Sequence, residues 1–174
     1  VYKDILRVQS GSDSQIYNGT PLMCHDYTIL SGLAYGDYLD DINFIVSIED
    51  VGIESNVMSF VVRNSYGQDI SSHYLIFIQY GRLQVTPREI VITLGSAEKE
   101  FDGEPLTCET ITYTGSLVDG HEIYIEFGDS ITNVGICDNT PSVIDIIDEY
   151  NNSYLRNYKV TIIDGLLKVT PKSK

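Results

Sequence analysis

Three histidines are the first candidates for chemistry in this sequence, because imidazole serves both as a metal ligand and as a proton-transfer group near neutral pH. They are His25, His73 and His121. A metal centre needs several donors that converge, and none of the three belongs to a cluster of donors at ligand spacing. We therefore interpret them as isolated surface histidines and expect neither a metal site nor a cofactor.

Two runs of carboxylates could instead supply the oxygen ligands that calcium prefers. The runs are Asp37, Asp40 and Asp41 in the first half of the chain, and Asp145, Asp148 and Glu149 in the second. Neither run has the alternating oxygen ligands and the turn glycine of a dedicated calcium loop. Calcium binding is therefore the less favoured interpretation of both runs.

Covalent catalysis would need an activated nucleophile, and the sequence has no G-x-S-x-G elbow, no glycine-rich phosphate loop and no repeated Cys/His arrangement. Cys24 and Cys108 each follow a leucine by two residues, in what should be a strand, which favours buried thiols that act as small hydrophobic side chains. A disulfide between Cys108 and Cys137, the only pair within one half, stays open. We expect no catalytic residue and therefore a protein that is not an enzyme.

Aromatic side chains offer a different kind of site, since a tyrosine can stack on a sugar ring or pack against a protein partner. Tyr35 and Tyr38 lie in a turn-rich segment that the second half of the chain does not reproduce. We name these two tyrosines as the candidate ligand-binding residues for a glycan or a host protein.

The elements that must position these side chains come in two copies. Tyr17–Cys24 returns as Phe101–Cys108, and Tyr80–Pro87 returns as Asp164–Pro171, both at the same spacing. The repeating unit is too long for a solenoid turn and has the length of a small domain. We therefore expect two tandem domains, 1–86 and 87–174. No Gly/Ser-rich linker separates the two copies, and Pro87 stands at the boundary.

Short alternating runs, broken by Gly, Asn, Asp and Pro, predict strands within each copy. The predicted strands include Ile5–Val8, Ile42–Ile48, Met58–Arg63, Ile90–Thr93, Ile123–Phe127 and Val143–Ile147. Asp164–Gly165, and Tyr80–Gly81 in the first copy, predict hairpins closed by a type I′ turn, in which both central residues need positive φ. Asn18–Gly19 and Asp102–Gly103 predict turns with a positive-φ glycine. The fold class is all-β, with two immunoglobulin-like β-sandwich modules related by the internal repeat.

Two segments of the second copy, Lys99–Leu106 and Asn157–Pro171, resemble the Tyr-Asp-Gly element and the "Asn-Tyr … Gly-x-Leu-x-Val-Thr-Pro" ending of the MBG/YDG-type repeats of bacterial surface proteins. The first copy has Tyr17–Gly19 for the first element and His73–Tyr74 for the start of the second. The resemblance covers both copies. It implies an immunoglobulin-like spacer or adhesin repeat in a long, exported, cell-wall-associated protein, and it implies no catalytic residue.

Charge restricts the expected partners. The 174 residues carry 25 acidic and 11 basic side chains, a formal net charge of −14. Such a field repels nucleic acid, and no apolar run is long enough to span a bilayer, so we expect neither nucleic-acid binding nor membrane insertion of this segment. The expected partners of this monomer are neighbouring repeats of one parent chain, because the segment begins and ends at the same phase of the repeat. The leading expectation is a spacer at the bacterial surface, and a glycan- or host-protein-binding module is the alternative.

Overall fold

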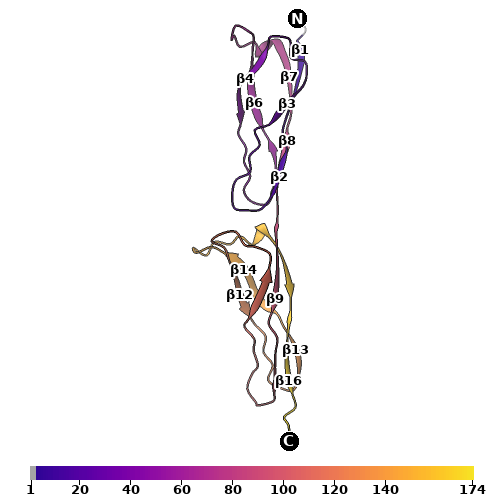
Figure 1. Cartoon of the computed structure of the whole chain (residues 1–174), viewed down its shortest axis with the longest axis vertical. Helices are drawn as coiled ribbons and strands as arrows, with labels where there is room; N and C mark the ends of the chain where they lie inside the picture. The colour runs from indigo at the N-terminus through magenta and orange to yellow at the C-terminus, as the bar shows by residue number, and fades with distance from the viewer. Residues whose placement is uncertain (1–2) are drawn as a thin grey trace. The chain divides into compact units, whose positions relative to one another are not determined.

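The structure is a computed structural model that describes residues 3–174, and it is nearly all β. Within that range the only helical pieces are two 3₁₀ turns, η1 (Ser71–His73) and η2 (Leu155–Asn157). The chain divides into two compact units, 1–86 and 87–174, and each unit holds eight strands (Figure 1). The prediction of an all-β chain is confirmed.

The strands of the two units follow one another in the same order. The first unit contains β1 (Asp4–Ser10), β2 (Asp13–Ile16), β3 (Tyr27–Ser31), β4 (Tyr38–Phe44), β5 (Gly52–Asn56), β6 (Met58–Arg63), β7 (Tyr74–Gln79) and β8 (Gly81–Thr86). The second contains β9 (Arg88–Leu94), β10 (Ala97–Glu100), β11 (Ile111–Thr114), β12 (Glu122–Phe127), β13 (Gly135–Asn139), β14 (Pro141–Ile147), β15 (Tyr158–Ile163) and β16 (Gly165–Thr170).

The strand predicted at Ile42–Ile48 lies earlier in the chain. It begins at Tyr38 and ends at Phe44, and its pairing with β6 is interrupted between Asp40 and Asn43. Asp41, inside that interruption, has a φ of 49°. A β-bulge of this kind re-aims the strand, so the alternation seen in the sequence does not continue to Ile48.

Two long segments form the framework of each unit. In the first unit we call β1 with β2 the first segment, and β7 with β8 the last segment. β1 pairs with β7 in parallel from Asp4 to Gln9, and β2 pairs with β8 in parallel from Asp13 to Ile16. In the second unit β9 and β15, and then β10 and β16, pair in the same parallel manner. Because the segments run side by side in one direction, the chain begins at one end of each unit and leaves at the other.

The parallel pairing corrects the predicted hairpins at Asp164–Gly165 and Tyr80–Gly81. The strands before and after each glycine do not pair with one another but belong to different sheets, so no type I′ turn forms. Neither glycine has a positive φ. The two-residue signal was wrong because the last segment passes straight through this point and pairs with the first segment, which lies at the opposite end of the unit's sequence.

A close approach of the two segments, and not a turn, explains the glycine. A Cβ atom on Gly81 would lie 2.1 Å from the carbonyl oxygen of Gly11, and one on Gly165 would lie 1.9 Å from that of Gly95. Serine hydroxyls continue the ladder at the place where the paired segments pass from one sheet to the next, which we call the crossing point. There the Arg82 N–H donates to Ser12 Oγ at 2.9 Å. Only glycine allows the two backbones to touch here.

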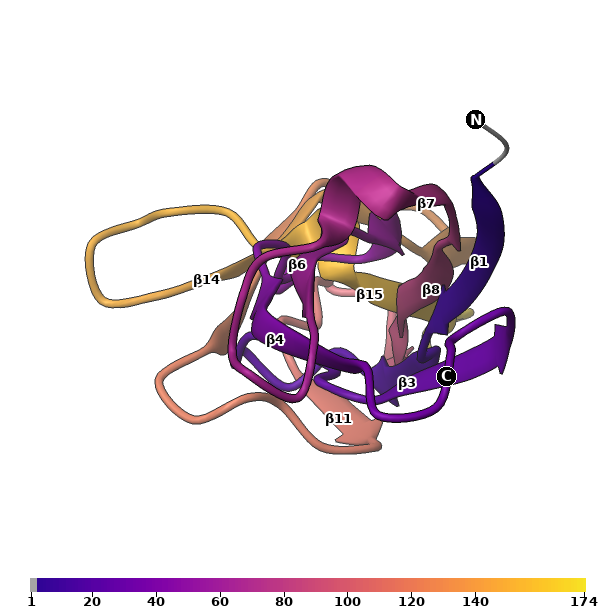
Figure 2. The ribbon, with the colours of Figure 1, turned by 90° about the horizontal axis from the view of Figure 1, so that it is seen from above.

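The other strands flank these segments. β3 pairs with β1, β5 pairs with β8, and β4 pairs with β6, all antiparallel. Figure 2 shows β4 and β6 across from β1 and β7 in the first unit. The space between them is filled by the core.

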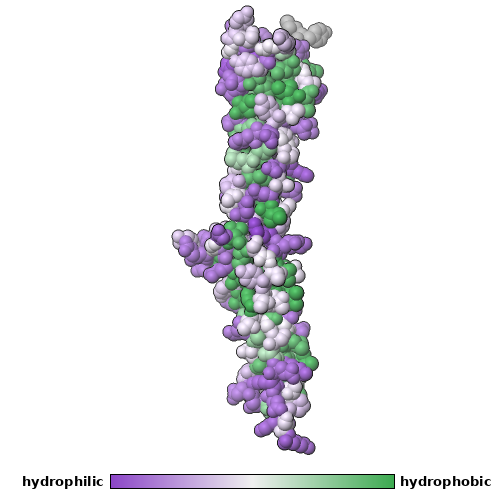
Figure 3. All heavy atoms as spheres, viewed as in Figure 1, coloured by the Kyte–Doolittle hydropathy of each residue, from purple (hydrophilic) through white to green (hydrophobic). Residues whose placement is uncertain are grey.

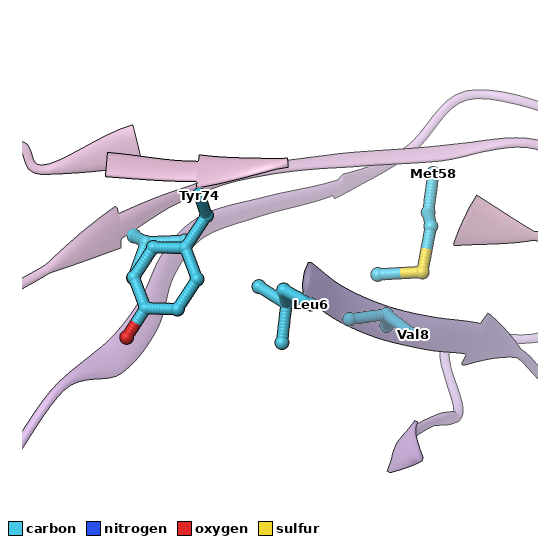
Figure 4. Packing of buried hydrophobic residues seen from close by; sticks show 5 residues of the cluster. Leu6, Val8, Met58 and Tyr74 are labelled. Atoms are coloured by element: carbon cyan, nitrogen blue, oxygen red, sulfur yellow. The ribbon is translucent and has the colours of Figure 1, made fainter. Parts of the chain in front are cut away.

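That core is built from side chains that alternate along the strands. Leu6 and Val8 of β1 pack with Met58 and Val62 of β6 and with Tyr74 of β7, and all five are buried (Figure 4). Alternation puts every second side chain on the inner face, which explains why short period-two runs were enough to predict these strands.

Six core positions of the repeat are buried in both units. The pairs, each buried in both units, are Leu6 and Ile90, Val8 and Ile92, Val62 and Ile146, Tyr74 and Tyr158, Leu83 and Leu167, and Val85 and Val169.

The turn predicted at Asn18–Gly19 and Asp102–Gly103 is confirmed, since Gly19 and Gly103 have φ values of 77° and 81°.

A fully buried asparagine ties each unit together. Asn56 Nδ2 donates to the carbonyl oxygens of Gly11 and Cys24, both at 2.9 Å. Asn139 makes the equivalent two bonds in the second unit, also at 2.9 Å. Each amide therefore holds the loop after β2 or β10 against the crossing point.

Candidate functional site

The turn before β4 displays the two tyrosines named from the sequence. Tyr35 is fully exposed, and Tyr38, the first residue of β4, is partly exposed. The turn is closed by a hydrogen bond from the Asp37 N–H to the Ala34 carbonyl oxygen at 3.1 Å. The structure thus brings Tyr35 and Tyr38 to one end of the first unit.

A buried tyrosine anchors this turn from below. The hydroxyl of Tyr74 accepts a hydrogen bond from the Ala34 N–H at 3.0 Å and donates one to Asp37 Oδ2 at 2.6 Å. Burial, together with the bond to Asp37, raises the pKa of the Tyr74 hydroxyl. A core residue therefore fixes the geometry of a surface turn.

The second unit uses the same anchor with a different partner. The Tyr158 hydroxyl accepts from the Val118 N–H at 3.0 Å and lies 2.8 Å from His121 Nδ1. The His121 ring also stacks on Tyr154, with ring centroids 4.1 Å apart. Burial lowers the pKa of His121, although the charge of Asp148 opposes this. His121 is therefore a half-buried structural residue, which corrects its interpretation as an isolated surface histidine.

A second exposed tyrosine turn occurs in both units, directly after β6 and β14. Tyr66 is 88% exposed and Tyr150 is 76% exposed. They stand at equivalent places of the internal repeat. Figure 2 shows the segment after β14 projecting from the second unit.

The same side-chain chemistry holds both of these turns. Asn64 Oδ1 accepts the N–H groups of Tyr66 and Gln68, both at 3.0 Å. Asp148 Oδ1 accepts the N–H groups of Tyr150 and Asn152, both at 2.9 Å. Such side-chain-to-backbone bonds order a turn, so each tyrosine is presented from a defined loop.

Sequence reasoning missed Tyr66 and Tyr150, although the signal was present. The two turns share a tyrosine, a preceding Asn or Asp and the repeat spacing. The sequence-based prediction named Tyr35 and Tyr38, which lie in a segment that differs between the copies. Recurrence would have pointed to Tyr66 and Tyr150.

The carboxylates of the first unit are used in an ion pair. Arg63 contacts Asp40 Oδ2 through Nε at 2.7 Å and Asp41 Oδ2 through Nη2 at 2.9 Å. The Asp41 N–H and the Arg63 guanidinium hold the pKa of Asp40 below its usual value. Arg63 Nη1 also donates to the Gly67 carbonyl oxygen at 3.2 Å, so the pair braces the turn that carries Tyr66.

The carboxylates of the second unit also serve local structure. Asp145 Oδ1 accepts the Ser153 hydroxyl at 2.6 Å, and Asp148 Oδ2 accepts the Tyr154 hydroxyl at 3.0 Å. Desolvation raises the pKa of Asp148, but hydrogen bonds led by that from the Asn152 N–H outweigh it and keep this pKa low. Across residues 3–174 no three His, Cys, Asp or Glu side chains are arranged to hold a metal ion.

The cysteines are free thiols. Cys24 is buried, as expected, whereas Cys108 and Cys137 are only half-buried. Cys108 Sγ lies 3.3 Å from Thr110 Oγ1 and 3.8 Å from the Ser96 carbonyl oxygen. The disulfide left open between Cys108 and Cys137 is not formed.

An apolar outer face on β1 and β7 distinguishes the first unit. Ile5 and Leu75 are paired neighbours there and are both about half exposed. Figure 3 shows hydrophobic residues gathered over this part of the unit. At the matching positions the second unit has Glu89 and Lys159, which approach each other at 3.7 Å. The shared fold therefore accepts either apolar or charged residues on this face.

No protein-family model matches this sequence, and no curated protein matches it. None of the helical segments in residues 3–174 has the length and apolar character needed to cross a membrane. The exposed turns of the two units present tyrosines beside hydrogen-bonding carboxylates and amides. Such groups can stack on and hydrogen-bond to a ligand.

Proposed function

We propose that each unit is an immunoglobulin-like β-sandwich module and that the chain is a non-catalytic spacer segment of a larger bacterial surface protein. One observation carries this proposal: in both units the first and last segments pair in parallel, so the chain begins at one end and leaves at the other. A module built this way can be joined to the next without the chain doubling back.

The length of a folded unit, compared with that of a flexible linker, indicates what such a module adds. The first segment, Asp4 to Ile16, spans 13 residues, or about 40 Å at the rise of a strand. A flexible linker of 86 residues has a root-mean-square end-to-end distance of roughly 50 Å, but its ends also approach closely. The module therefore supplies a defined separation and not a longer reach.

The surface location rests on the resemblance to bacterial surface repeats and on charge. A formal net charge of −14 disfavours binding to nucleic acid or to anionic lipid, and it helps to keep repeated copies soluble. Neighbouring repeats of the same parent chain are the proposed partners, and no cofactor takes part.

A display experiment tests the spacer function. The chain is placed between a bacterial surface anchor and a small reporter domain, and the control carries a flexible Gly/Ser linker of equal length at the same place. We expect the folded chain to give the higher fraction of reporters accessible to a bulky antibody, because it holds the reporter at a defined distance. Equal accessibility of the two displays would contradict the spacer function.

Recurrence of an exposed tyrosine favours a second candidate function, recognition of a neutral glycan or of a host protein. Tyr66 and Tyr150 contribute little to either core, yet both units present them from turns with the same hydrogen bonds. A glycan array with Tyr66→Ala and Tyr150→Ala variants tests this function, with Tyr113→Ala as the exposed control. Binding that survives loss of both turn tyrosines, or that disappears with the control, would contradict it. Tyr35→Ala and Tyr38→Ala test the sequence-based site in the same assay.

A further inference from the structure

The path of the chain through each unit decides how tension would act on it. A pull on the two ends draws the first segment toward the end where the unit begins and the last segment toward the end where it finishes. The two segments are paired with each other along this direction. The ladder between them is therefore loaded in shear.

We propose that each unit is a force-bearing module and that the parallel ladder between its first and last segments is the element that resists tension. This inference rests on the proposed spacer function for its biological meaning, since a surface spacer transmits any load applied to its distal end. The mechanical property itself follows from the strand pairing.

Shear loading matters because the hydrogen bonds of a ladder lie across the strands. Under a pull along the strands many bonds carry the load together, whereas a pull that separates two strands at one end breaks them in turn. Six residue pairs join β1 and β7, and four join β2 and β8. The second unit has the same six and four.

Additional hydrogen bonds extend the ladder beyond the paired strand residues. At the crossing point, the Gly81 N–H donates to Ser10 Oγ at 2.8 Å. At the far end, the Tyr17 N–H donates to the Thr86 carbonyl oxygen at 2.8 Å. The second unit repeats this last bond between Phe101 and Thr170, also at 2.8 Å. The ladder therefore continues nearly without a break from one end of the unit to the other.

The residues between the two segments are protected from the load. In the first unit, residues 17–73 form the connecting strands and turns, and tension reaches them only after the ladder has broken. Failure should then release the whole unit at once. A chain of 86 residues extends to about 31 nm, so after subtraction of the folded length each event should add roughly 27 nm.

Single-molecule force spectroscopy on the full chain tests the proposal by changing only the pulling direction. One measurement uses handles at the two ends of the chain. The other uses the N-terminal handle and a ligation tag inserted between Ser72 and His73, next to the start of β7, where Asp4 pairs with Tyr74. The second geometry peels β1 from β7 one pair at a time. We expect the unfolding force of the first unit to be several-fold higher when the chain is pulled by its ends, and equal forces would overturn the proposal.

Proline substitutions locate the resisting element. Because successive residues of a strand direct their N–H groups to opposite sides, one of Leu75→Pro and Ile76→Pro must remove a bond to β1. The matched controls are Ile53→Pro and Glu54→Pro in β5, an edge strand outside the ladder. When a β7 variant and a β5 variant lose the same free energy of unfolding, the β7 variant should lower the end-to-end unfolding force and the β5 variant should not. The opposite ranking would overturn the assignment.

If the proline variants fail to fold, the comparison of pulling directions still decides the question, since it uses the unaltered sequence of every strand. The result is also separable from the display experiment. A chain with no directional difference in force could still act as a spacer, and a strong chain could still fail to improve reporter accessibility.

Discussion

Gly165 offers the sharpest test of how each unit is held together. A Cβ atom at this position would lie 1.9 Å from the Gly95 carbonyl oxygen, and ordinary contact begins at 3.4 Å. The two segments would have to separate at their crossing point by the difference between these two distances. The bond from the Leu166 N–H to Ser96 Oγ, 2.9 Å long, lies directly beside this point and would break.

The cost follows from these displacements. Overpacking of a tight contact costs about 1–3 kcal/mol, and each lost hydrogen bond adds about 1 kcal/mol. We therefore expect Gly165→Ala to lower the free energy of unfolding of the second unit by about 2–4 kcal/mol. Gly103→Ala is the matched control, because Gly103 has a positive φ of 81° and open space around it. Its cost should be closer to about 1 kcal/mol.

Gly165→Asn separates the steric explanation from a type I′ turn. Asparagine tolerates positive φ, so a true turn would accept it at little cost, whereas the crossing point excludes any side chain. Denaturant unfolding, monitored by hydrogen exchange and mass spectrometry, gives the stability of each unit separately. The unaltered first unit serves as the internal reference. A Gly165→Asn variant within about 0.5 kcal/mol of the parent would refute the crossing-point argument.

Three further changes test other contacts. Asn139→Ala removes the two hydrogen bonds that this buried amide donates to backbone carbonyls, so we expect the second unit to lose about 2–3 kcal/mol in urea unfolding, and an unchanged midpoint would exclude this role. His121 has a pKa lowered from 6.5, so the unfolded chain takes up its proton first and the stability of the second unit should fall as the pH drops below 6.5. His121→Asp, which introduces the residue of the first unit at this position, should remove that slope between about pH 5 and pH 7 in a thermal melt, and a persistent slope would assign it to another group. Ile5→Glu combined with Leu75→Lys introduces the charged pair of the second unit and should change stability by no more than about 0.5 kcal/mol, so a loss well above about 1 kcal/mol would show that the first unit needs its apolar face.

The sequence by itself determined the architecture at the level of repeats, strands and core. The internal repeat divided the chain into 1–86 and 87–174. The alternation of apolar residues identified the core residues, because a strand turns every second side chain to the same face. Leu6 and Ile90 illustrate this, since both are buried at matching positions of the repeat. The turns at Gly19 and Gly103 could also be predicted, because a glycine after Asn or Asp is a local sequence signal for a turn with positive φ.

Only the tertiary structure decided which strands meet. Asp164–Gly165 carried a strong local hairpin signal, yet β15 and β16 take their parallel partners from the start of the unit. Pairing across such distances depends on the packing of the whole unit, which no window of neighbouring residues contains. The candidate site shows the same division, because the sequence predicted a site at Tyr35 and Tyr38 but not the anchoring hydroxyl of Tyr74, which lies far along the chain from the turn that it holds. The prediction of a surface position for His121 was wrong for the same reason, since its burial is produced by Tyr154 and Tyr158, which fold onto it from a turn and a strand far along the chain.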